Sequence, residues 1–146
     1  MAWTASGLYV LNWIDLLDAT QLAIDTSLTT HKIAMYDNVE TPNFSTEVGY
    51  AATNEVTGTG YTAGGQVVIT PTTTESPAGT LMYDLGDQVW ASPTSVTAYG
   101  SKLYADALVG NNLIVAHNFG GAFTSTAGTF TIQWAATGVF TIDLTP

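Results

Sequence analysis

The chain has 146 residues and no Cys, so disulfides and thiolate chemistry are excluded, and the length predicts one domain spanning 1–146. Twelve acidic residues stand against two Lys and no Arg, which gives a formal net charge of -10. Because phosphate binding depends on clustered Lys and Arg, this charge argues against nucleic acid as a partner.

The first residues carry no targeting signal that we can identify. Positions 1–4 lack a basic residue, and the apolar run 8–17 is interrupted by Asn12, Trp13 and Asp15. We therefore expect neither a signal peptide nor a membrane span.

The same region predicts one amphipathic helix over 6–18. Ser6 is a candidate N-cap, and apolar residues follow at helical spacing, among them Leu11 and Ile14. Asn12 and Asp15 fall on or near the opposite face. We expect the apolar face, which includes Trp13, to pack against the rest of the domain.

Beyond His31 the hydrophobic period changes to two, which is typical of strands with one buried face. Such runs, separated by Gly, Pro, Asn and Asp, occur at 32–36, 66–70, 80–85, 88–91, 94–105, 112–117, 129–134 and 139–144. Short strands at this spacing predict an antiparallel β-sandwich, or a barrel-like sandwich, over 31–146.

Three local features refine this expectation. The apolar residues 113–115 are continuous, which predicts a strand buried on both faces. The last two runs are expected to form a hairpin through 135–138. The Thr- and Pro-rich stretch 70–77 is expected to be an exposed loop.

No arrangement of nucleophile, base or metal ligands stands out. His31 and His117 are the only histidines and do not share a metal-binding spacing, so each is expected to be a surface or hydrogen-bonded structural residue. No Ser lies in a Gly-x-Ser-x-Gly motif. We expect no catalytic, cofactor-binding or metal-binding residue.

Two carboxylate pairs are candidates for calcium or glycosidase sites. Asp84 lies near Asp87, and Glu47 and Glu55 flank a predicted turn, but neither pair has the dense Asp-x-Asp spacing of a calcium loop. Both pairs are expected to be solvated.

The aromatic residues offer candidates for a partner surface or a sugar-stacking platform. Trp13 and Trp134 fall on faces predicted to be buried, which leaves Trp3 and Trp90 as surface candidates. Together with Tyr61, they are the residues that we expect at a partner interface.

Glycines cluster between positions 58 and 65. Gly58, Gly60, Gly64 and Gly65 could suggest a phosphate loop, but the Lys of such a loop is absent and a strand-like run follows. Turns that need a positive φ are the favoured interpretation, with at least one of the four glycines in that conformation.

The segment 55–65, EVTGTGYTAGG, together with 30–36, the turn at 38–42, 128–134 and 138–142, resembles a family of structural proteins from tailed bacteriophages. The resemblance extends over most of the chain. It is closest to the capsid decoration or minor capsid proteins of phages that infect actinobacteria.

This resemblance implies a protein made in the host cytoplasm that attaches to the assembled capsid and stabilises it without catalysis. The implied partner is the major capsid protein, and a homo-oligomer such as a trimer would fit the family. The alternatives are a phage tail or adhesion module, a carbohydrate-binding sandwich and, less favoured, an enzyme.

Overall fold

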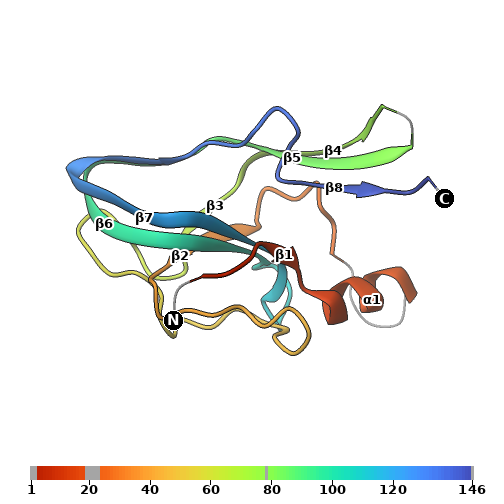
Figure 1. Cartoon of the computed structure of the whole chain (residues 1–146), viewed down its shortest axis with the longest axis horizontal. Helices are drawn as coiled ribbons and strands as arrows, with labels where there is room; N and C mark the ends of the chain where they lie inside the picture. Colours follow the sequence, from red (N-terminus) through yellow and green to blue (C-terminus); the bar gives the residue numbers. More distant parts are fainter. Residues whose placement is uncertain (1–2, 19–23, 78, 146) are drawn as a thin grey trace.

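The computed structural model describes residues 3–18, 24–77 and 79–145, and it is mainly β. Two antiparallel sheets pack as a sandwich with one short N-terminal helix, which confirms the predicted fold class (Figure 1). The elements are β1 (Gly7–Leu8), α1 (Val10–Asp18), β2 (Lys32–Tyr36), β3 (Gln66–Val67), β4 (Ile69–Ser76), β5 (Thr80–Gly86), β6 (Gln88–Ala105), β7 (Asn112–Ile132) and β8 (Phe140–Asp143).

The larger sheet has the strand order β1-β7-β6-β2-β3, and β2 therefore lies between two neighbours. Ile33 and Met35 contribute to the core between the sheets, whereas Ala34 and Tyr36 belong to a second cluster on the other face. All four side chains are fully buried. The second cluster exists because the N-terminal segment and the long connection 37–65 cover the outer face of this sheet.

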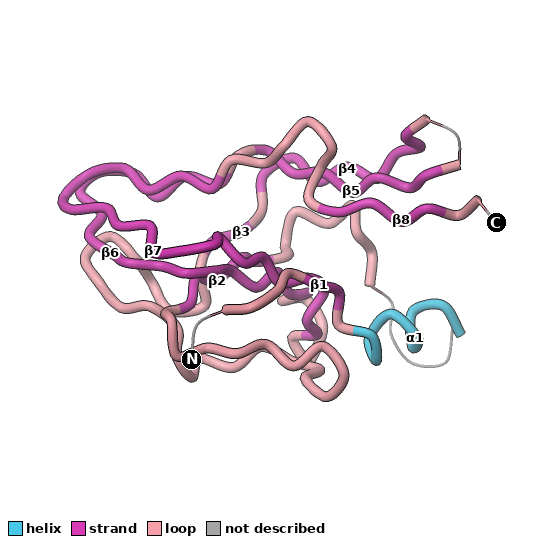
Figure 2. Tube along the Cα trace, in the orientation of Figure 1, coloured by secondary structure: helices cyan, strands magenta, loops and turns pink. Residues whose placement is uncertain are grey.

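β6 and β7 form a long hairpin that passes from one layer to the other at the end opposite α1 (Figures 1 and 2). The pairing register shifts between Trp90 and Thr94, between Thr94 and Val96, and between Ala98 and Gly100. Irregularities of this kind bend a strand and increase its twist. They allow one hairpin to contribute to both layers.

The smaller sheet, with the order β4-β5-β8, corrects two predictions. β8 pairs with β5 and not with the end of β7, so the expected C-terminal hairpin is wrong. The stretch expected to be a loop is largely β4, which pairs with β5 over Ile69 to Ser76. Pro71 is compatible with this assignment because β4 is an edge strand, where a missing N–H can face away from the sheet.

The helix corrects two more predictions. It begins at Val10, because Gly7 and Leu8 pair with β7, and Ser6 accepts a hydrogen bond from the Asn118 N–H at 2.8 Å instead of capping the helix. Trp13 packs against the central core as expected, but the rest of the predicted face does not. Leu11 and Ile14 are 41% and 52% exposed, whereas Asn12 is 1% exposed.

Asn12 is buried because it completes the hydrogen bonding of neighbouring backbone. Its amide nitrogen donates to the carbonyls of Val48 and Leu113, both at 2.7 Å, and its oxygen accepts from the Asn112 side chain at 3.2 Å. A buried amide with its partners supplied is stable, whereas leaving those carbonyls unpaired would be costly. Hydrogen bonding therefore overrides the hydrophobic pattern of α1.

The prediction for residues 113–115 is confirmed, since Leu113, Ile114 and Val115 are all buried, with Leu113 in the outer cluster and the other two in the central core. Among the residues placed in the structure, no helix has the length and hydropathy needed to cross a membrane.

Candidate functional site

The connection between β2 and β3, residues 37–65, holds most of the polar side chains that the fold buries on its outer face. It is tied to β2 by backbone hydrogen bonds from Val56 N–H to the Met35 carbonyl and from Asp37 N–H to the Asn54 carbonyl, both at 3.0 Å. Two carboxylate clusters organise this connection, one around Glu55 and one around Lys102.

Glu55 is the centre of the first cluster. Its carboxylate accepts hydrogen bonds from the hydroxyls of Tyr50 and Tyr61 and, at 2.8 Å, from the Gly64 N–H. The Tyr104 hydroxyl donates to the Gly64 carbonyl at 2.7 Å, so the same turn is also joined to β6. Burial first, and the bond to Glu55 next, raise the pKa of Tyr61 above its usual range. The phenol is therefore a fixed donor at every physiological pH.

The glycines beside Glu55 are required by backbone geometry, which confirms the turn interpretation. Gly60, Gly64 and Gly65 have φ values of 76°, 90° and 73°. A Cβ on Gly65 would lie 1.9 Å from the Ile33 carbonyl oxygen, and one on Gly58 would lie 1.9 Å from the Ser95 carbonyl oxygen. The segment 55–65 thus closes a turn against β2 and β6.

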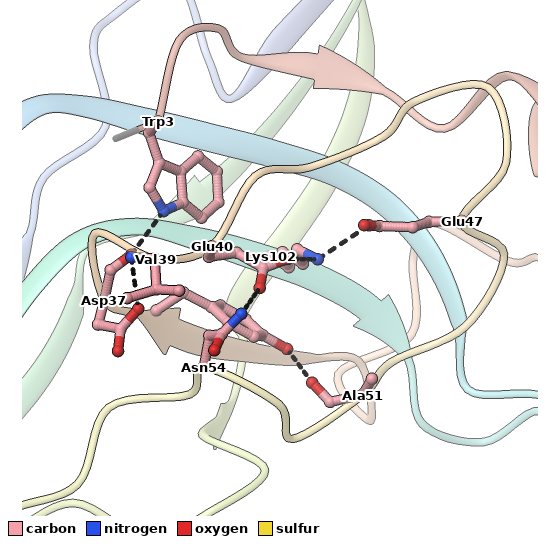
Figure 3. Close-up of polar contacts among 9 residues, drawn as sticks. Trp3, Asp37, Val39, Glu40, Glu47, Ala51, Asn54 and Lys102 are labelled. Carbon is pink, nitrogen blue, oxygen red and sulfur yellow. Dashed lines mark hydrogen bonds and ion pairs between the residues drawn. The ribbon is translucent and has the colours of Figure 1, made fainter. Parts of the chain in front are cut away.

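Lys102 is the centre of the second cluster (Figure 3). Its ammonium group contacts the Glu40 carboxylate directly and lies 2.9 Å from the Glu47 carboxylate. The Asn54 amide donates to the second oxygen of Glu40 at 3.0 Å. The side chains of Lys102 and Glu40 are 5% and 9% exposed, whereas that of Glu47 is 30% exposed.

Aromatic rings form the walls of this cluster. The Lys102 nitrogen lies 4.9 Å from the centroid of the Tyr36 ring and 6.0 Å from that of Tyr9. Burial, followed by the negative charge of Glu47, raises the pKa of Tyr9 above its usual range, so this phenol also stays neutral. A cavity of about 380 Å³ opens beside the cluster and is lined by Glu40, Glu47 and Lys102 among others.

The other lysine is also paired within the chain. Lys32 lies 2.9 Å from the Asp106 carboxylate, with the two side chains 32% and 34% exposed. The sequence has no Arg, so Lys32 and Lys102 are its only Lys or Arg side chains. Each of the two has a carboxylate partner within the chain. The exposed charge is therefore overwhelmingly negative.

Trp3 and Trp90, expected at the surface, are instead 6% and 0% exposed, so that expectation is wrong. The Trp3 indole donates to the Asp37 carbonyl at 3.0 Å, and Trp90 packs in the central core. Tyr61 is half-buried and bound to Glu55. The fold places these rings inside because the connection 37–65 and the bend of the β6–β7 hairpin cover them, and neither covering is visible in local sequence.

The histidines have structural positions. His31 is buried, with Nε2 2.7 Å from the Asp25 carbonyl oxygen, and burial lowers its pKa. His117 packs its ring against Trp134 at a centroid distance of 4.8 Å, and burial lowers its pKa to about 4. Across residues 3–18, 24–77 and 79–145, no three His, Asp or Glu side chains gather as metal ligands would.

The carboxylates of the two candidate pairs have different roles in the structure. Asp84 accepts from the Leu85 N–H at 2.9 Å, and Asp87 accepts from the Trp134 N–H at 3.1 Å. Glu47 and Glu55 belong to the two different clusters. Sequence reasoning missed the Lys102 cluster, for which the available signal was a lone Lys followed by apolar residues inside a predicted strand.

No family model, no curated protein and no solved structure matches this chain.

Proposed function

We propose that this chain is a structural protein of a tailed-phage virion, which attaches to the assembled capsid through the major capsid protein and stabilises the shell. The proposal rests on the resemblance of segment 55–65 to phage virion proteins. In this chain Glu55, Gly64 and Gly65 of that segment close a turn that holds the covering connection on the sheet. A rigid sandwich of this kind suits an attachment module.

The internal pairing of both lysines bears on how the chain would bind that partner. Lys32 and Lys102 are each bound to carboxylates of the same chain, so ion pairs with a partner would have to use this protein's acidic groups alone. We assign the affinity mainly to apolar burial and backbone hydrogen bonding.

The helix α1, part of the connection 37–65 and the turn between β6 and β7 lie at the same end of the molecule (Figure 1). Each of these segments carries exposed apolar residues. We call this the helix-end surface, and its members are Val10, Leu11, Ile14, Val48 and Val109. Its parts are held together by Asn12, which links α1 to Val48, and by the hydrogen bond from Tyr50 N–H to the Asn111 carbonyl at 2.9 Å. We assign the capsid contact to this surface.

The test is sedimentation of the purified chain with capsids that lack it, at NaCl concentrations from low salt to about 1 M. The Debye length falls from about 8 Å at physiological ionic strength to about 3 Å at 1 M, which screens repulsion between acidic copies. We expect occupancy to hold or rise with salt. A steep fall would show that the carboxylates meet a basic patch on the capsid, and absence of binding at every salt concentration would contradict the proposed function.

A further inference from the structure

Lys102 has an environment that is unusual for a lysine. Lys102 lies on β6, the central strand of the larger sheet, and its amine is buried between Glu40 and Glu47 (Figure 3). The rings of Tyr36 and Tyr9 lie beside the amine. Burying an ion pair carries a desolvation penalty that the attraction between the charges often fails to repay. A reaction that removes both charges would relieve that penalty.

We propose that Lys102 and Glu40 form an intramolecular isopeptide bond, with Glu47 as the proton carrier. A proton first passes from the Lys102 ammonium to the Glu40 carboxylate, which leaves a neutral amine and a neutral carboxyl group. The nitrogen lone pair then attacks Cδ of Glu40. Glu47 takes a proton from the nitrogen and returns it to the departing hydroxyl, so that the Nζ–Cδ bond forms and the Cδ–O bond breaks.

The products are one amide and one water, and no oxidant or second substrate is needed. Lys102 loses one positive charge and Glu40 loses one negative charge, so the net charge of the chain is unchanged. The steps are those of nucleophilic catalysis by an amine assisted by a general base and acid.

The geometry favours Glu40 as the acceptor. One of its oxygens contacts the Lys102 amine, and the other accepts from Asn54 at 3.0 Å, so the carboxyl group is held on both sides. Holding the reacting groups together in this way replaces an encounter in solution and can lower the barrier greatly. Asn54 is a positioning residue.

Glu47 is better placed as the proton carrier. It lies 2.9 Å from the same amine but is the most exposed of the three side chains. It lines the cavity of about 380 Å³ together with Glu40, which provides a route by which the released water can leave.

The pair formed by Lys32 and Asp106 serves as an internal comparison. Its charged atoms are also 2.9 Å apart, but about a third of each side chain is exposed. Water therefore stabilises both charges, and we expect no bond there.

A bond at this position would cross-link the folded chain covalently, although the chain has no Cys and therefore no disulfides. It would join β6 to the covering connection across 62 positions of sequence. Closing a long loop of the unfolded chain raises stability, as disulfides do.

The test is intact-mass spectrometry of the folded, purified full chain under denaturing conditions. We expect wild-type protein to be lighter than its sequence by one water, and a digest to contain a branched peptide joining Lys102 to Glu40. Lys102→Arg should have the full sequence mass. Glu40→Gln should lose one ammonia instead of one water, because the leaving group is then the amide nitrogen.

Glu47→Gln should slow bond formation by at least about 100-fold, as loss of a general base does. Lys32→Arg should keep the mass deficit of the wild type. Wild-type protein that is folded by circular dichroism but retains its full sequence mass after prolonged incubation would overturn the proposal. A deficit that persists in Lys102→Arg would overturn it as well, because the lost water would then come from another position.

Discussion

The hydroxyl of Tyr61 donates a hydrogen bond to Glu55 and accepts one from the backbone N–H of Met35 at 2.9 Å. One phenol oxygen therefore joins the Gly-rich turn to the buried strand β2. Tyr61 and Glu55 both lie in the segment 55–65, and the structure gives them a role in folding.

Tyr61→Phe should lower the free energy of unfolding by roughly 2 to 3 kcal/mol. It leaves the Met35 N–H without its hydroxyl partner and removes one of the two donors to one Glu55 oxygen, which keeps the Gly64 N–H. A buried group left unpaired carries its full desolvation penalty. Tyr99→Phe is the control, because the Tyr99 hydroxyl makes no hydrogen bond within the part of the chain that is described. Urea denaturation measures both variants, and equal stabilities would contradict this role for Tyr61.

Gly65→Ala should destabilise the fold by at least about 2 kcal/mol. Its φ is 73°, and the new Cβ would meet the backbone oxygen of Ile33. Gly121→Ala is the matched control, since nothing lies within 4 Å of the Cβ position there and its φ is not positive. Thermal melting should show a large loss for the first variant and little change for the second. A neutral Gly65→Ala would mean that the turn is misplaced.

Stability should fall as the pH drops from about 6.5 to about 4. Burial lowers the pKa of His117 to about 4 in the folded chain, against about 6.5 when unfolded, so the unfolded state takes up the proton first. The contribution of this residue is at most roughly 3 kcal/mol, present above pH 6.5 and lost toward pH 4. Burial also lowers the pKa of His31, which adds a slope of the same sign.

His117→Gln should therefore have a smaller pH dependence of stability than the wild type, measured by denaturation at pH 7 and pH 4.5. Its binding to capsids at neutral pH should remain close to that of the wild type. Identical slopes for the two proteins would show that His117 is not buried in its neutral form.

Leu11→Asp and Ile14→Asp should each reduce capsid binding by at least about tenfold without unfolding the chain. Both side chains are exposed on the helix-end surface, so a charge there is tolerated in the free protein but must be desolvated in a complex. Val67→Asp on β3 is the control, because Val67 is similarly exposed but lies outside that surface. Equal binding by all three variants would place the contact elsewhere.

Local patterns predicted those parts of the fold that depend on neighbouring residues. The strand at 32–36 was predicted with its observed bounds, and the double-sided burial of Leu113 to Val115 followed from an uninterrupted apolar run. Alternation also predicted the sandwich. These features are set by each strand's own side chains.

The errors concern long-range contacts. β8 pairs with β5, and the paired residues are 57 to 63 positions apart in the sequence. No local signal in the sequence distinguishes β5 from β7 as the partner of β8. Asn12 faces inward because of carbonyls at Val48 and Leu113, and Trp3 is covered by a connection that follows much later in the chain. The Lys102 cluster likewise joins residues that only the fold brings together.

We propose that the chain is a component of the capsid surface. The most direct measurement is the copy number of this protein relative to the major capsid protein in purified virions, determined by quantitative mass spectrometry. We expect a fixed ratio with many copies per particle, as for a protein that covers the shell. A few copies per particle would place it in the tail, and absence from purified virions would contradict the account.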